Sequence, residues 1–103
     1  MSVLNIKKDN FQSVVLESNK PVLVDFFANW CGPCRMLSPI VDAFAQEHPH
    51  IKVGKVNVDD ESELAKQFRV MTIPTVLVFE NGKEIKRSVG AISEEELEEL
   101  FED

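Results

Sequence analysis

A pair of cysteines at the junction between a strand and a helix limits how this chain can fold. The pair lies in Trp30–Cys34, which reads Trp-Cys-Gly-Pro-Cys and contains both cysteines of the chain. An apolar run, Val22–Ala28, precedes it, and helical periodicity begins near Pro33. Two thiols placed here can close a small disulfide ring and reopen it without unfolding the chain. The motif therefore predicts a redox site.

The start of the following helix favours an anion at the first cysteine. A helix N-terminus presents unpaired N–H groups and the positive end of the macrodipole. Both stabilise a thiolate relative to a thiol. We therefore expect Cys31 to be the nucleophile.

Three other interpretations of the cysteines fit the motif less well. A structural disulfide between residues so close would constrain little of the unfolded chain. A zinc site needs two more ligands, and His48 and His50 have only Pro49 between them. Zinc-binding histidine pairs usually have about three to five residues between them, so we expect no metal here. Two inert buried cysteines would need neither the Gly-Pro between them nor the preceding tryptophan.

Length and charge exclude several classes of function. The 103 residues are expected to form one domain, 1–103, with a core that needs no metal or disulfide. The net charge of −7, from 18 acidic and 11 basic side chains, argues against nucleic acid and anionic membranes as partners. Met1–Lys8 lacks the pattern of a signal peptide, and no stretch could span a bilayer. We therefore expect a cytoplasmic protein, in a compartment where cysteine pairs are more often catalytic than structural.

Hydrophobic periodicity predicts strands that alternate with helices, followed by a hairpin with Asn81-Gly82 at its turn. The strands are expected at Val3–Ile6, Val22–Ala28, Ile51–Val58, Thr75–Glu80 and Lys83–Val89. Three helices have the spacing of a capping box at their starts: Asp9 with Gln12, Asp60 with Glu63, and Ser93 with Glu96. The remaining helix starts near Pro33, and we expect Pro39 to kink it without dividing it.

Two charged residues interrupt the predicted strands. Asp25 lies within the apolar run, where burial raises the pKa of an unpaired carboxyl. A buried acid near two thiols is a candidate proton carrier, and a structural role is the alternative. Lys55 shares a strand face with Ile51 and Val53, which makes Asp25 on a neighbouring strand its natural partner. In the alternative, the stem of Lys55 packs while its ammonium group reaches solvent.

The order of these features resembles the thioredoxin family over essentially the whole chain. Besides the cysteine motif, the residues at family positions are Val24-Asp25-Phe26, Pro39, Lys55, Ile73-Pro74-Thr75 and Val89-Gly90-Ala91. Phe27 departs from the pattern, since many members carry a second tryptophan there. The resemblance implies an α/β fold with a five-stranded mixed sheet flanked by four helices, and a cis Pro74 that faces the cysteines.

The resemblance also implies a general protein-disulfide reductase. Cys31 would attack a substrate disulfide to form a mixed disulfide, and Cys34 would resolve it by attacking Cys31. Asp25, with Lys55 as its candidate partner, would take the proton from Cys34, either directly or through a water molecule. The family implies a monomer with no bound cofactor. Its electrons would come from NADPH through a flavoprotein thioredoxin reductase, and its acceptors would be disulfide-containing proteins.

A shallow apolar surface around the cysteines is the substrate site that the resemblance implies. Its residues would be Trp30, Gly32, Pro33, Met71, Thr72, Ile73, Pro74, Gly90 and Ala91. An extended substrate segment could form hydrogen bonds with the backbone near Ile73.

Two alternative functions stay open at this point. The first is a thiol oxidant or isomerase on the same fold. The missing signal-peptide pattern and the uncharged Gly32-Pro33 dipeptide count against it. The second is a non-catalytic binding module, which would not accelerate the reduction of insulin by dithiothreitol.

Overall fold

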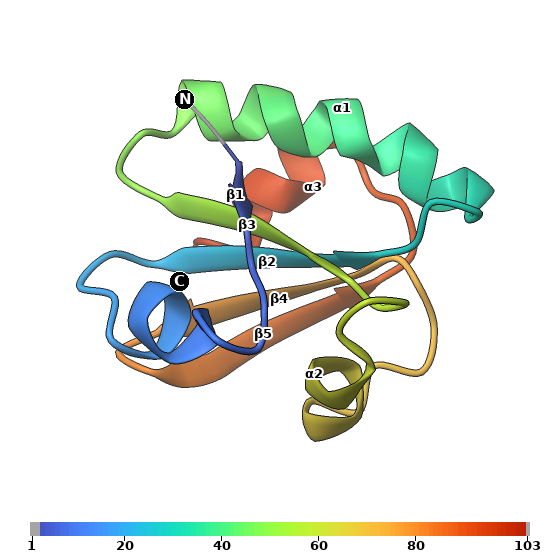
Figure 1. Ribbon diagram of the computed structural model, residues 1–103. Coiled ribbons are helices and arrows are strands. Elements are labelled where there is room, and N and C mark those ends of the chain that lie inside the picture. The colour runs from blue at the N-terminus through green and yellow to red at the C-terminus, as the bar shows by residue number, and fades with distance from the viewer. Residues whose placement is uncertain (1–2, 103) are drawn as a thin grey trace.

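A five-stranded mixed sheet forms the centre of the molecule and carries helices on both faces (Figure 1). The computed structural model describes residues 3–102, so the ends of the predicted domain, Met1, Ser2 and Asp103, lie outside the described residues. The strands are β1 (Leu4–Asn5), β2 (Val22–Phe27), β3 (Lys52–Asn57), β4 (Thr75–Glu80) and β5 (Lys83–Val89). The helices are the π-helix η1 (Gln12–Leu16), α1 (Gly32–Glu47), α2 (Ser62–Gln67) and α3 (Glu94–Glu99). The predicted fold class, sheet and four helices are confirmed.

Strand β2 lies at the centre of the sheet, whose order is β1-β3-β2-β4-β5. It pairs in parallel with β3 and antiparallel with β4. Because helices cover both faces, the first five residues of β2 are buried whichever way their side chains point. The apolar run was therefore a correct signal for a central strand. The edge strand β1 is shorter than the predicted Val3–Ile6.

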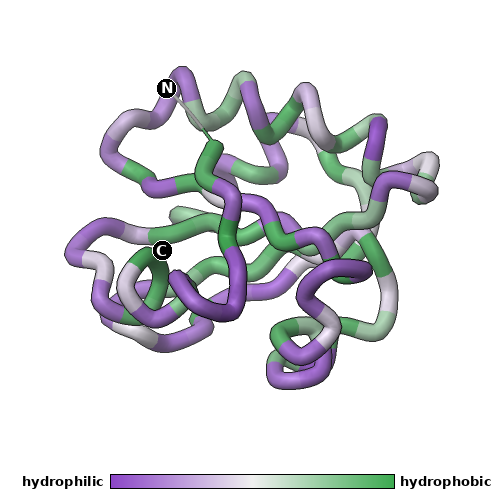
Figure 2. Tube along the Cα trace, in the orientation of Figure 1, coloured by the Kyte–Doolittle hydropathy of each residue, from purple (hydrophilic) through white to green (hydrophobic). Residues whose placement is uncertain are grey.

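Alternation along β2 divides the core into two parts. Val22, Val24 and Phe26 pack with residues of η1 and α2 on one face. Leu23 packs with α1 and α3 on the other face, and Asp25 follows it two residues later on that same face. Figure 2 shows hydrophobic residues concentrated along the central strands, while α1 alternates between hydrophobic and hydrophilic positions. The sheet thus directs Asp25 toward α1.

The capping box predicted for the last helix is confirmed. The Ser93 hydroxyl accepts a hydrogen bond from the Glu96 N–H, and the Glu96 carboxylate accepts one from the Ser93 N–H. These bonds satisfy two backbone donors at the exposed end of α3. The start of α3 therefore follows a signal that is local in the sequence.

The capping boxes predicted at the two other helices are wrong, because both helices begin later than the spacing requires. The first residue of η1 is Gln12, so Asp9 stands too far upstream to cap it. There the Asn10 side chain closes the preceding turn by accepting the Lys7 N–H. Helix α2 begins at Ser62 with Glu61 as its N-cap, which leaves Asp60 one residue outside.

The β4–β5 hairpin matches its predicted bounds. Asn81 and Gly82 form the turn, and both have positive φ angles, 53° and 81°. Two consecutive positive φ values are what a type I′ turn requires, which explains the Asn-Gly sequence. The hairpin sets the end of the sheet opposite β1.

Candidate active site

The two cysteines lie where β2 gives way to α1. Cys31 is the N-cap residue of α1, and Pro33 occupies the first turn, where its missing N–H costs no helical hydrogen bond. A disulfide joins Cys31 to Cys34, with their Cα atoms 5.2 Å apart. Both residues are buried. The predicted small ring is therefore present in its oxidised form at the strand–helix junction.

A backbone hydrogen bond distinguishes the sulfur atom of Cys31 from that of Cys34. The Cys31 Sγ accepts a hydrogen bond from the Cys34 N–H at 3.2 Å, as an N-cap side chain does. This donor and the N-terminal end of the helix dipole both stabilise negative charge on that sulfur. The arrangement supports Cys31 as the thiolate of the pair.

Helix α1 continues without interruption from the cysteines to Glu47. Pro39 lies inside it, and the chain still forms one helix from Gly32 to Glu47, as expected. The kink expected at Pro39 stays a prediction. Because α1 is continuous, the side chains one and two turns beyond Cys34 are held rigidly beside the site.

The loop that precedes β4 faces the cysteines from across the site. The Ile73–Pro74 peptide bond is cis, as the family resemblance implied. The Ile73 carbonyl oxygen lies 3.8 Å from the Cys31 Sγ, and the Ile73 side chain packs against the cysteine pair. The Gly90 N–H donates to the Pro74 carbonyl at 2.8 Å, which brings the end of β5 to the same place. Segments far apart in sequence therefore meet at Cys31.

The predicted substrate surface is mostly open to solvent. Trp30 is 68% exposed and Met71 is 92% exposed. Ile73 and Gly90 are half-buried, whereas Pro74 is buried beneath them. The remaining members of the predicted surface are exposed: Gly32, Pro33, Thr72 and Ala91. Met36 on α1, two residues after Cys34, is also 68% exposed and was not singled out from the sequence.

One side-chain contact at this surface was not predicted. The Trp30 indole Nε1 donates a hydrogen bond to the Asp59 carboxylate at 2.9 Å. Asp59 follows β3, and no local pattern in the sequence links it to Trp30, since their proximity depends on the parallel pairing of β2 with β3. The bond fixes the indole beside Cys31.

Asp25 is buried next to Cys34. Its side chain borders a cavity of about 120 Å³ that is also lined by Cys34, Arg35, Ser38 and Lys55. The residue is 1% exposed, and its Oδ1 atom has no hydrogen-bond partner among the described residues. Burial raises the pKa of Asp25 to about 7, with Lys55 opposing the rise and Asp42 adding to it. The raised pKa confirms what the apolar strand predicted.

Of the two alternatives for Lys55, a direct ion pair with Asp25 is not the one that the described residues show. The two residues are register partners on β3 and β2, but the Lys55 Nζ donates to the Ser38 hydroxyl at 2.5 Å. It also forms an ion pair with the Asp42 carboxylate at 3.3 Å. The alternative, in which the stem of Lys55 packs and its ammonium group reaches the surface, fits better, because the side chain is 19% exposed and its Nζ pairs with the 56% exposed Asp42. The charge of Lys55 still lowers the pKa of Asp25 by electrostatic attraction, without a hydrogen bond between them.

Ser38 and Asp42 were not identified as site residues from the sequence. A signal was present, because Cys34, Ser38 and Asp42 recur at intervals of four and so share one face of α1. That face looks toward β3, where Lys55 meets it. This shared face could be recognised as part of the site only with the knowledge that Lys55 lies opposite α1.

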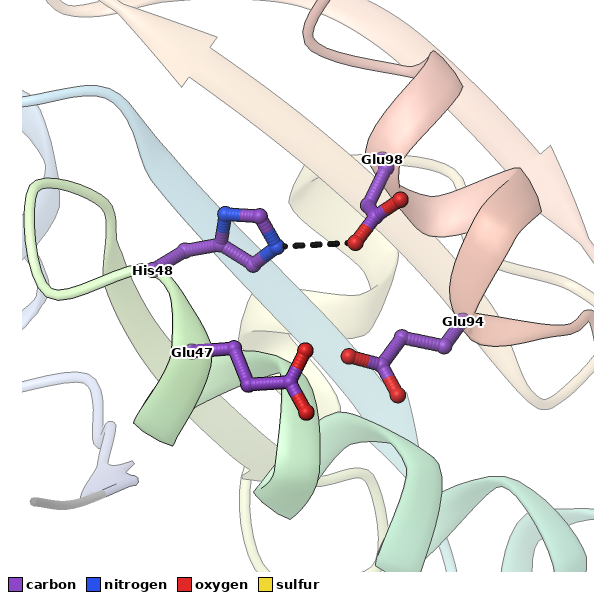
Figure 3. A group of neighbouring side chains, drawn as sticks. All are labelled: Glu47, His48, Glu94 and Glu98. Carbon is purple, nitrogen blue, oxygen red and sulfur yellow. Dashed lines mark hydrogen bonds and ion pairs between the residues drawn. The ribbon is translucent and has the colours of Figure 1, made fainter.

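The histidines lie at the other end of α1. His48 Nε2 lies 3.1 Å from a carboxylate oxygen of Glu98, and Glu47 and Glu94 approach the same point from α1 and α3 (Figure 3). The neighbouring Glu47 carboxyl raises the pKa of Glu94. Between Cys34 and His48 the helix extends roughly 21 Å, at a rise of 1.5 Å per residue. Cysteines and histidines therefore cannot share one zinc ion, which supports the redox interpretation.

Fold and site together define the class of protein. A cysteine pair that closes a ring at a helix N-terminus, with a buried acid beside it, is the site of a dithiol–disulfide oxidoreductase. The thioredoxin family model matches residues 2–103. The chain belongs to the thioredoxin family.

Several thioredoxins are similar to this chain over most of its length. It is 46% identical to the thioredoxin of Chlamydia pneumoniae over 96 residues, which cover 93% of this chain and 92% of that protein. It is 41% identical to the thioredoxin of Alicyclobacillus acidocaldarius over 103 residues, which cover 99% and 97%. A bifunctional thioredoxin reductase/thioredoxin of Mycobacterium leprae is 45% identical over 89 residues, or 85% of this chain and 19% of that protein.

Family membership assigns the chemistry to the cysteine pair. The protein is a disulfide reductase whose Cys31–Cys34 disulfide stands at the redox-active position, and thioredoxins bind no cofactor of their own. None of the helices within residues 3–102 is long and apolar enough to cross a membrane.

Proposed function

We propose that Cys31 is the attacking thiolate and Cys34 the resolving thiol of this reductase. The Cys31 thiolate attacks one sulfur of a substrate disulfide, that bond breaks, and the other substrate sulfur leaves as a thiolate. Cys34 then loses its proton and attacks Cys31, which expels the second substrate sulfur and leaves the ring oxidised. Two electrons pass from the dithiol to the substrate. The hydrogen bond from the Cys34 N–H to the Cys31 Sγ is the observation that supports these roles.

Asp25 is the proposed acceptor of the Cys34 proton. Cys34 and Asp25 line the same cavity, and about 120 Å³ leaves room for a water molecule between them. A carboxyl with a pKa of about 7 takes up and releases protons at neutral pH. Because Cys34 is held beside the mixed disulfide, the second step is unimolecular and has a high effective concentration.

An extended segment of a disulfide-containing protein is the proposed substrate. It would lie over Trp30 and Met71, whose exposed apolar side chains flank the cysteines. Its backbone would form hydrogen bonds at Ile73, as a strand does when it adds to an exposed edge. The remaining contacts would be with Gly32, Pro33, Thr72, Pro74, Gly90 and Ala91.

The proposed electron donor is an NADPH-dependent flavoprotein thioredoxin reductase. The name of the M. leprae relative combines thioredoxin reductase with thioredoxin, which supports this partner. We further propose that the chain acts as a monomer of one domain, residues 1–103, in the cytoplasm. Its net charge of −7 favours solubility.

Turnover of insulin tests the reductase against a non-catalytic binding module. We expect the protein to accelerate insulin reduction by dithiothreitol and to be recycled by a thioredoxin reductase with NADPH. Cys31→Ser provides the control, since it retains the surface and removes the nucleophile. Equal rates with the protein and with Cys31→Ser would contradict the proposal.

A further inference from the structure

Two residues of α1 hold the ammonium group of Lys55 at the edge of the Asp25 cavity. Ser38 lines the cavity and accepts a hydrogen bond from the Lys55 Nζ at 2.5 Å. Asp42, one turn further along α1, binds the same nitrogen at 3.3 Å and is more than half exposed. The ammonium group therefore has one anchor on the cavity side and one on the solvent side.

We propose that Ser38 and Asp42 are positioning residues. Together they hold the ammonium group of Lys55 between the buried Asp25 and the surface, and its position sets the pH at which Asp25 ionises. This inference rests on the proposed function of Asp25 as the proton acceptor for Cys34. Among the described residues, neither side chain forms a hydrogen bond with a cysteine sulfur, and both bind Lys55.

The charged groups around Asp25 give the two anchors opposite effects. Lys55 faces it from β3, while Asp42 and Arg35 lie on α1, and β4 places the apolar Val76 opposite it. Asp42 competes with Asp25 for one ammonium group and adds a negative charge of its own, so it disfavours ionisation of Asp25. Ser38 carries no charge and keeps the ammonium group near the cavity, so it favours ionisation.

Substitution of each anchor should therefore shift Asp25 in opposite directions. In Asp42→Asn the ammonium group loses its solvent-side anchor, and Asp25 should ionise at a pH lower by about 0.5 to 1 unit. In Ser38→Ala the ammonium group follows Asp42 outward, and Asp25 should ionise at a higher pH by a similar amount.

The experiment is a titration of the Asp25 carboxyl carbon by NMR, with the full-length oxidised protein. Glu80→Gln is the matched control, since it removes one negative charge at an exposed position at the end of β4. Lys55→Met supplies the second background, in which Asp42→Asn should shift Asp25 by less than half as much as in the parent. This double-mutant cycle separates the contribution of Lys55 from the direct field of Asp42.

Three results would overturn the inference. They are an equal shift in Asp42→Asn and Glu80→Gln, an undiminished shift in the Lys55→Met background, and an unchanged midpoint in Ser38→Ala. The rate at which Cys34 releases substrate from the mixed disulfide, measured against pH, tests the underlying function separately. If the NMR midpoints move as expected but this pH profile does not follow them, the positioning of Lys55 stands and the proton-acceptor role of Asp25 fails.

Discussion

The reactivity of single residues here depends on which polar groups the backbone brings to them. Cys31 receives an N–H donor from Cys34 and the end of a helix dipole, both of which favour its anion. Asp25 is buried, and its Oδ1 atom has no hydrogen-bond partner among residues 3–102, so its neutral form is favoured. The same part of the fold therefore favours the anion of Cys31 and the neutral form of Asp25.

The roles of the two cysteines can be separated by trapping. We expect Cys34→Ser to accumulate mixed disulfides with substrate proteins, because the resolving thiol is missing and Cys31 can still attack. Cys31→Ser should trap almost none. Non-reducing gel electrophoresis after incubation with a disulfide-containing substrate measures both, and equal trapping by the two variants would refute the assignment.

The dipeptide between the cysteines should control the reduction potential. Pro33 is exposed and uncharged, and a histidine there would place a donor and a cation next to Cys31. The thiolate, and with it the reduced form, would then be stabilised. Each unit by which the Cys31 pKa falls below ambient pH corresponds to ~1.4 kcal/mol, or ~30 mV for two electrons.

We therefore expect Pro33→His to raise the potential and to weaken insulin reduction. Equilibration of both proteins with glutathione measures the change. A potential that stays constant or falls would show that helix and loop geometry, and not the dipeptide, make this protein reducing.

At the scale of whole elements, α1 organises the site. Its core-facing residues Leu37, Val41 and Phe44 pack against the sheet, while Cys34 and Ser38 line the Asp25 cavity. The apolar packing sets the rotation of α1 about its own axis. The same packing therefore also fixes the direction in which Cys34 and Ser38 face the cavity. Helix α3 packs against it at Leu97 and begins at the capping box of Ser93.

Loss of this capping box should destabilise the protein. Ser93→Ala removes the acceptor for the Glu96 N–H, and we expect the free energy of unfolding to fall by about 1 kcal/mol. Asp60→Ala is the matched control, because Asp60 has the same sequence spacing but does not cap α2, and its effect should be below about 0.5 kcal/mol. Urea denaturation compares the two. A cost for Asp60→Ala as large as that for Ser93→Ala would show that the capping assignment is wrong.

At the scale of the whole molecule, the burial of Asp25 in the core contributes to the pH dependence of stability. The sheet has an apolar layer on each face, and Asp25 lies inside the layer under α1. Unfolding exposes this carboxyl to water and returns its pKa from about 7 to the ordinary value of 3.8. The proton affinity of one side chain is therefore coupled to the global folding equilibrium.

The contribution of Asp25 to stability should fall as the pH rises from about 4 to about 7. The folded state binds the Asp25 proton more tightly than the unfolded state does, so its stabilising effect is complete below pH 3.8 and is lost as the pH rises through about 7. A difference of about 3 units corresponds to at most about 4 kcal/mol. Asp25→Asn should therefore be more stable than the parent at pH 8.5, and by much less at pH 5.

Urea unfolding of the oxidised parent and of Asp25→Asn at both pH values measures this difference. Cancellation of the other titrating groups is expected, because both proteins share them. The same difference in unfolding free energy at the two pH values would show that Asp25 is not a carboxyl with a raised pKa. A lower stability of Asp25→Asn at pH 8.5 would indicate a structural role.

Local and periodic signals allowed much of the fold to be predicted. The apolar run of β2, the Asn81-Gly82 turn and the Ser93 capping box are each complete within a few residues, and each is confirmed. The capping boxes at Asp9 and Asp60 failed, because spacing alone does not say where a helix begins. The sequence left the partner of Lys55 open between Asp25 and solvent, because the choice depends on groups outside the local pattern.

The sequence by itself determined the cysteine ring, the helix that starts at it and the burial of Asp25. Each of these follows from neighbouring residues whose spacing is fixed by the covalent chain. Only the tertiary structure decided which side chains bind them: Asp59 on Trp30, and Ser38 and Asp42 on Lys55. Strand register and helix packing place these residues together across long stretches of chain. An ion pair with an exposed carboxylate costs less desolvation than one with a buried carboxylate. Lys55 therefore pairs with the more exposed Asp42, and the Oδ1 atom of Asp25 is left without a hydrogen-bond partner among the described residues.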